Sequence, residues 1–138
     1  MILKPAVNIV LPVSNMKRSR RYYRDVLGFR EEGGLFFLPT AETTAALELK
    51  VITEKDAAVI HSGKKFASFE YEIATSFLSY FMGMFERGAV FDMACQHPGG
   101  YFARVSDPDG NEFEIHCSSF EEDDEEVDPW QAPFYFRY

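Results

Sequence analysis

The stretch VSDPDGNEFEIHC, residues 105–117, combines a tight turn with the strand that follows it. Asp107 to Gly110 has the residue types of a turn, and Gly110 supplies the positive φ that such a turn requires. After the turn, polar and apolar residues alternate, which is typical of a half-buried strand. Two sets of side chains are therefore expected on opposite faces, a polar set of Glu112, Glu114 and His116 and an apolar, core-facing set of Phe113, Ile115 and Cys117.

The polar face of this strand admits three interpretations, namely a metal site, a site for a cationic ligand, or a solvated sheet surface. By the same alternation, Ser68 shares a face with Glu70 and Glu72. Carboxylates gathered on one face repel one another, so a cationic partner is expected beside them. Arg104 is the candidate: it would neutralise carboxylates or hold a substrate anion, and a surface ion pair is the alternative. For His116 the alternative to a binding role is a surface or hydrogen-bonded histidine.

The same order of elements is expected twice along the chain. A strand at 7–13 precedes a helix that begins after Asn15 and ends at Gly28, and a strand at 66–73 precedes a helix that begins after Thr75 and ends at Gly88. An interval of 60 residues separates both pairs of helix ends. Three strands are expected after each helix, near 29–32, 35–38 and 45–52 in the first half and near 90–95, 101–106 and 111–117 in the second.

This repetition predicts an α+β fold made of two βαβββ modules, at about residues 5–53 and 66–118. Each helix covers one face of its sheet, so the two sheets are expected to curve into one half-barrel cup with the helices outside. Such a concavity is where ligands prefer to bind. Residues 1–118 would form the domain, and 119–138 an acidic and then aromatic tail.

The amino-acid composition and charge limit the kinds of binding partner that are expected. The net charge is -8, but residues 121–128 hold seven of the 22 acidic residues, so the remainder is near neutral. Since no basic stripe is present, nucleic acid is not expected as a partner. No apolar run approaches the roughly 20 residues of a membrane span, and a cytoplasmic protein is expected. Cys95 and Cys117 are expected to be buried, reduced thiols.

Two motifs resemble the vicinal oxygen chelate superfamily, which contains glyoxalase I, bleomycin-resistance proteins, fosfomycin-resistance enzymes and extradiol dioxygenases. PVSNMKRSRRYYRDVLGFREE, residues 12–32, is similar to its strand exit, helix and LGF signature. VSDPDGNEFEI, residues 105–115, is similar to its DPDGN hairpin. The resemblance covers about residues 5–118 and implies the half-barrel fold, but not one activity, because the superfamily hosts many chemistries.

The resemblance also implies where a metal would bind. Metal-dependent members take one ligand from the first and last strand of each module, and these positions are Asn8, Glu48, Ser68 and Glu114 in this chain. Asn and Ser stand where His or Gln is usual, and they are poor ligands for zinc, nickel or iron. No cofactor is therefore expected, and purified protein should hold less than about 0.1 equivalent of transition metal. A divalent cation, with His116 as a substitute ligand, is the alternative.

Three hypotheses of function follow from these observations. The first is a small-molecule-binding protein of the glyoxalase/bleomycin-resistance type, without a transition metal, that holds a cationic or polar organic ligand. Its site would be lined by Asn8, Glu48, Ser68, Glu70, Arg104, Glu114 and His116. The second is a metal-dependent lyase or isomerase in which Glu48 and Glu114 act as ligands or as the base; a dioxygenase is disfavoured. The third is an interaction module acting through the aromatic tail, and the resemblance itself implies a homodimer.

Overall fold

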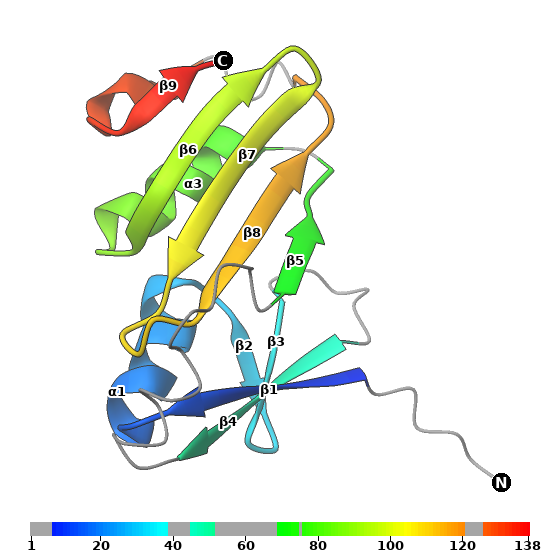
Figure 1. The fold of residues 1–138 in the computed structure, drawn as a ribbon, viewed down its shortest axis with the longest axis vertical. Coiled ribbons are helices and arrows are strands. Elements are labelled where there is room, and N and C mark those ends of the chain that lie inside the picture. Colours follow the sequence, from blue (N-terminus) through cyan, green and yellow to red (C-terminus); the bar gives the residue numbers. More distant parts are fainter. Residues whose placement is uncertain (1–6, 39–44, 52–68, 75, 121–125) are drawn as a thin grey trace, which may run out of the picture. The chain divides into compact units, whose positions relative to one another are not determined.

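The computed structural model describes residues 7–38, 45–51, 69–74, 76–120 and 126–138. The chain forms two compact units, Met1–Lys64 and Lys65–Tyr138, and each is considered by itself (Figure 1). Each unit begins with one strand, which is followed by a helix and then by three further strands of the module. The predicted α+β class and the duplicated βαβββ order are therefore confirmed, whereas the single cup formed by both sheets stays a prediction.

The first unit contains β1 (Val7–Val13), α1 (Met16–Arg21), a π-helical turn η1 (Tyr22–Val26), β2 (Arg30–Glu32), β3 (Leu35–Phe37) and β4 (Ala45–Val51). Its sheet has the order β1-β4-β3-β2, with β1 parallel to β4. The helix begins where expected, since the side chain of Asn15 accepts a hydrogen bond from the Arg18 amide at 3.0 Å. It was expected to be one α-helix, but its second half is the π-helical turn.

The core of the first unit lies between this helix and the sheet. Tyr23 is fully buried, and its ring centroid lies 5.7 Å from that of Phe29 and 5.9 Å from that of Phe36. Leu11 and Val13 of β1 are buried in the same core. The positively charged side chains of α1 occupy the other face of the helix, as its spacing predicts.

The second unit contains β5 (Phe69–Glu72), α3 (Phe77–Glu86), β6 (Val90–His97), β7 (Gly100–Ser106), β8 (Glu112–Cys117), a 3-10 turn η3 (Pro129–Gln131) and β9 (Tyr135–Arg137). Its sheet has the order β5-β8-β7-β6-β9. β5 is parallel to β8, so the first four strands repeat the arrangement of the first unit. Figure 1 shows α3 behind the sheet and β9 along its outer edge.

Packing of α3 decides which side chains face the core. Phe77 stacks on Tyr101 at 5.0 Å, and Phe81, fully buried, contacts Phe91 at 4.9 Å and Tyr135 at 5.8 Å. The alternation predicted for β8 is confirmed: its apolar side chains are at most 2% exposed, and these are Phe113, Ile115 and Cys117. The polar side chains of β8, which are Glu112, Glu114 and His116, therefore lie on the opposite face of the sheet.

The turn before β8 is held by Asp107. Its Oδ1 accepts hydrogen bonds from the amides of Asp109 and Asn111 at 2.9 and 2.8 Å, and its Oδ2 accepts one from the Asn111 side chain at 2.7 Å. Gly110 has a φ of 84°, as predicted. Asp107 is 5% exposed and Asn111 is fully buried, so the turn is anchored from inside the unit.

The tail gave no strand signal in the sequence, but its described part joins the sheet. β9 pairs in parallel with β6, and Phe134 stacks on Phe91 at 5.4 Å. The acidic residues 121–125 lie outside the described part of the chain. Both cysteines are buried and free, as expected. Among the described residues, no helix has the length and apolar character needed to cross a membrane.

Candidate functional site

A group of polar and aromatic side chains lies on the sheet of the second unit, on the face opposite α3. Cross-strand pairing aligns Glu70 and Arg104 with Glu114, and it aligns Phe102 with His116. Residues paired in this way project from the same face. We call Glu70, Phe102, Arg104, Glu114 and His116 the polar cluster.

Glu114 is the centre of the polar cluster. Arg104 Nη2 lies 3.1 Å from Glu114 Oε1, and His116 Nε2 lies 3.3 Å from Glu114 Oε2. His116 Nε2 is also 3.4 Å from Glu70 Oε2. The Glu114 side chain is 19% exposed, whereas that of Glu70 is 71% exposed. One carboxylate is thus held within the cluster and the other reaches solvent.

His116 connects the charged and aromatic parts of the cluster. Its Nε2 atom is buried and has no hydrogen-bond partner among the described residues, although two carboxylates are near it. The imidazole packs edge-on against Phe102 at 5.0 Å, and the Arg104 guanidinium lies 5.8 Å from the same ring. Apart from the imidazole, the cluster holds two carboxylates and one guanidinium, so these three groups together attract a cation more than an anion.

The structure brings together four of the seven side chains expected at the site, Glu70, Arg104, Glu114 and His116. Glu48 lies on β4 of the first unit, where it is exposed and pairs with Val10 across the sheet. Asn8 lies on β1, but its side chain is outside the described part, as is all of Ser68. Convergence of the four positions implied by the family resemblance therefore stays a prediction.

Phe102 is a member of the polar cluster that is not among the seven residues predicted from the sequence. It lies two residues before Arg104 on the same strand, so the alternation that assigns Arg104 to this face assigns Phe102 to it as well. The family motif does not include it, and an isolated phenylalanine within a strand is usually a core residue. Its role became visible only through its contact with His116.

The donor atoms of the polar cluster fit a divalent cation in number and type. One oxygen of Glu70, one of Glu114 and a ring nitrogen of His116 all lie within 4.8 Å of one another. Two carboxylates and an imidazole are ligands that zinc, nickel, iron and manganese accept. The guanidinium of Arg104 opposes a second positive charge at Glu114, because it already lies 3.1 Å from that carboxylate.

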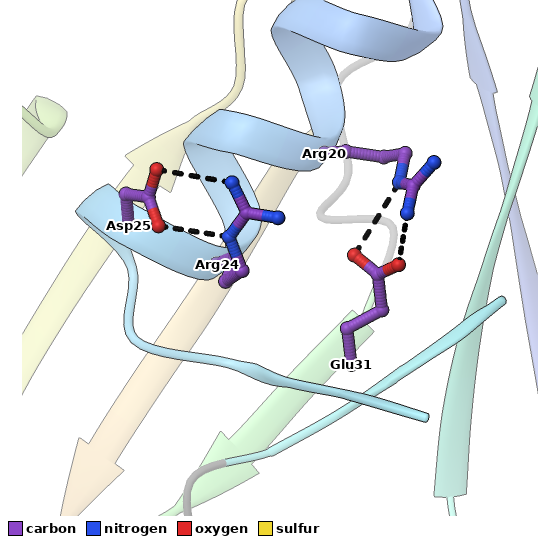
Figure 2. Close-up of polar contacts among 4 residues, drawn as sticks. All are labelled: Arg20, Arg24, Asp25 and Glu31. Carbon is purple, nitrogen blue, oxygen red and sulfur yellow. Dashed lines mark hydrogen bonds and ion pairs between the residues drawn. The ribbon is translucent and has the colours of Figure 1, made fainter. Parts of the chain in front are cut away.

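The first unit concentrates its charge on the helix instead. Arg20 pairs with Glu31, and Arg24 pairs with Asp25 at 2.9 Å (Figure 2). The hydrogen bond from Arg24 lowers the pKa of Asp25. A depression of about 520 Å³ on this helix is lined by Met16, Lys17, Arg20, Arg21 and Arg24. Lys17, Arg20, Arg21 and Arg24 are exposed, so solvent and salt screen their charges.

Residues 6–115 match the family model of the Glyoxalase/Bleomycin resistance protein/Dioxygenase superfamily. The chain belongs to this superfamily. No protein among the curated sequences matches it. Membership agrees with the duplicated module. It does not imply one particular activity, because the superfamily hosts many chemistries.

Several solved structures share the fold at low sequence identity. UcmS2 is 16% identical, with a TM-score of 0.65 over 78% of this chain and 93% of its own. A glyoxalase/dioxygenase from Nostoc punctiforme is 22% identical, with a TM-score of 0.64 over 82% and 90%. TnmS3, an antibiotic binding protein from Streptomyces sp. CB03234, is 20% identical, with a TM-score of 0.55 over 81% and 93%.

Proposed function

We propose that this protein binds a small organic cation at the polar cluster and sequesters it without chemical conversion. The observation that carries the proposal is the arrangement around His116: two carboxylate oxygens and an aromatic ring meet at one imidazole on the face of the sheet opposite α3. TnmS3, a structure of the same fold, is an antibiotic binding protein, which supports a small-molecule ligand for this chain.

Charge and contact favour an organic cation over the other ligands considered. An anion would have only Arg104, and the carboxylate of Glu114 already satisfies part of that guanidinium. A metal ion would have to approach Glu114 beside the positive charge of Arg104. An ammonium group can instead bind the exposed carboxylate of Glu70 while its apolar part rests on Phe102.

The test compares benzylammonium with benzoate by titration calorimetry, because the two probes differ mainly in the sign of their charge. We expect wild-type protein to bind benzylammonium at least about tenfold more tightly. Glu114→Gln should weaken that binding about tenfold, which corresponds to about 1.4 kcal/mol. Glu86→Gln removes the same charge from α3, on the opposite side of the sheet, and should change the affinity less than about twofold.

Benzoate binding as tightly as benzylammonium would overturn the proposal. Equal losses in Glu114→Gln and Glu86→Gln would also overturn it, because the effect would then be that of net charge alone. Glu48→Gln is a further arm of the titration. A loss comparable with that of Glu114→Gln would show that the first unit contributes to the site, as the family positions imply.

The second candidate, a lyase or isomerase that depends on a divalent cation, is favoured by the three donor atoms around His116. Glu70, Glu114 and His116 would hold the ion, which would supply a Lewis acid when bound. Under this hypothesis added Mn²⁺ or Ni²⁺ raises the melting temperature, and Glu114→Gln abolishes the rise. Our first proposal expects less than about 0.1 equivalent of metal in protein purified without chelator, and stoichiometric metal would favour the second candidate.

A further inference from the structure

We infer that the C-terminal strand β9 extends the ligand-binding face and that Phe136 selects cations carrying a long, flat aromatic body. The inference rests on the proposed function, because it takes the polar cluster as the place where the positive charge binds. It concerns a residue of the tail, which lies beyond residues 6–115, the part of the chain that matches the family model.

Pairing of β9 with β6 decides which way its side chains point. Tyr135 aligns with Ala94 and Phe136 with Cys95. Tyr135 is 5% exposed and its ring lies 5.8 Å from that of Phe81 on α3, so it faces the helix. Because successive side chains on a strand alternate, Phe136 projects from the opposite face, and it is 37% exposed.

Phe136 continues a row that begins in the polar cluster. Cross-strand pairs align His116 with Phe102, Phe102 with Cys95, and Cys95 with Phe136. The row contains no charged residue beyond His116, and Cys95, 4% exposed, acts as a small apolar side chain between the two rings. Neighbouring strands are about 4.8 Å apart, so three strand intervals place Phe136 roughly 14 Å from His116.

This row defines the class of ligand. When Glu70 and Glu114 bind the positive group of a ligand, the aromatic part of that ligand lies over Phe102, the nearest ring in the row. A single aromatic ring would reach Phe102 alone. A fused, planar ring system would cover Phe102 and Cys95 and reach Phe136, adding apolar contact at the far end. Phe136 should therefore affect long aromatic cations and leave short ones unaffected.

The test uses two probes with the same ammonium group, 1-pyrenemethylammonium and benzylammonium, in titrations of full-length protein. In wild-type protein we expect the pyrene probe to bind more tightly. Phe136→Ala should weaken the pyrene probe at least about fivefold and change benzylammonium less than about twofold. Phe136→Trp retains a flat ring and should restore the affinity for the pyrene probe. Phe120→Ala removes another aromatic side chain, 54% exposed and packed against Tyr101 of the core, and should affect neither probe.

The outcomes separate the inference from the proposed function. If Glu114→Gln weakens both probes but Phe136→Ala weakens neither, the inference is wrong and the proposed site stands. Equal weakening of both probes by Phe136→Ala also contradicts the inference, because it indicates a general disturbance of the sheet. If neither ammonium probe binds wild-type protein, both the proposed function and the inference are wrong. The melting temperature of each variant verifies that β9 remains in place.

Discussion

The two units have the same strand order and place their charges differently. In both, the first strand is a parallel neighbour of the strand that ends the βαβββ module, β4 or β8, and Val10 aligns with Glu48 in the first unit as Glu70 aligns with Glu114 in the second. In the first unit the ion pairs lie on the exposed side of the helix, within β2, and between the helix and β2, where Glu31 is 16% exposed. In the second they lie on the sheet, around a carboxylate that is 19% exposed.

Topology alone therefore does not locate a binding site. A charge on an exposed helix is screened by water and salt, so its contact with a ligand adds little affinity. A carboxylate that is partly removed from water, with an aromatic ring near it, interacts more strongly with a ligand of opposite charge. The four predictions below test whether the second unit is also the part whose polar and aromatic contacts matter most for stability.

The largest effect is expected from removal of the tail, because the second unit has a fifth strand, β9, that the described part of the first unit lacks. Truncation after Ser119 removes β9 together with the aromatic contacts of Phe134 and Tyr135. We expect the free energy of unfolding, measured in urea, to fall by about 3–5 kcal/mol. Tyr138→Ala, at a side chain that is 84% exposed, is the control and should cost less than about 0.5 kcal/mol.

The same truncation tests the interaction-module hypothesis and the predicted homodimer by sedimentation velocity. A shift from dimer to monomer would favour a role of the tail between subunits. Unchanged stability and unchanged oligomeric state together would eliminate that hypothesis, and they would contradict the packing of β9 described above.

The second prediction concerns the turn that holds β7 and β8 together. Asp107→Ala removes three hydrogen bonds, one from Asp109 and two from the buried Asn111. We expect a loss of about 2–3 kcal/mol in the free energy of unfolding. Asp107→Asn keeps the acceptor oxygen for the two amides and should lose less. A loss under about 0.5 kcal/mol in the alanine variant would show that the buried turn is no stronger than an exposed one.

Most of the fold could be predicted from local signals, as β1 illustrates. Its predicted bounds, Val7–Val13, agree with the structure, because a β-branched run ends at a helix cap. The same is true of the alternation that places Arg104, Glu114 and His116 on one face. β9 could not be predicted, because three residues are too few for a pattern and their pairing depends on the distant edge of β6. The π-helical turn at Tyr22–Val26 likewise has no signal in residue spacing.

The third prediction concerns a buried tyrosine pair between β5 and α3. The hydroxyl groups of Tyr71 and Tyr80 lie 2.7 Å apart. Burial raises the pKa of Tyr80 from 10.0 to about 12, and it raises the pKa of Tyr71 well above its usual range. Above pH 10 the unfolded chain loses these protons while the folded chain keeps them, so unfolding is favoured as the pH rises.

The contribution of this pair to the free energy of unfolding should therefore be constant below about pH 9. Between about pH 10 and 12 it should decrease by up to roughly 1.4 kcal/mol per pH unit for each tyrosine. Tyr80→Phe should make the decrease shallower in urea titrations at fixed pH, and the exposed Tyr138→Phe should leave it unchanged. An equally steep decrease in both variants would contradict a role for the pair.

The smallest effect is expected on β2 of the first unit, where the ion pair between Arg30 and Glu32 has side chains that are 48% and 63% exposed. A double-mutant cycle with alanine at both positions should give a coupling energy of about 0.5 kcal/mol or less, since solvent screens the charges. The same cycle on Arg104 and Glu114, exposed by 35% and 19%, should give about 1–2 kcal/mol. Raising the salt concentration from about 0.1 M to 1 M should reduce the first coupling toward zero and the second by a smaller fraction. If the two couplings are equal and equally sensitive to salt, burial does not distinguish the polar cluster from the exposed pair on β2, and the choice of the second unit as the binding site loses its physical basis.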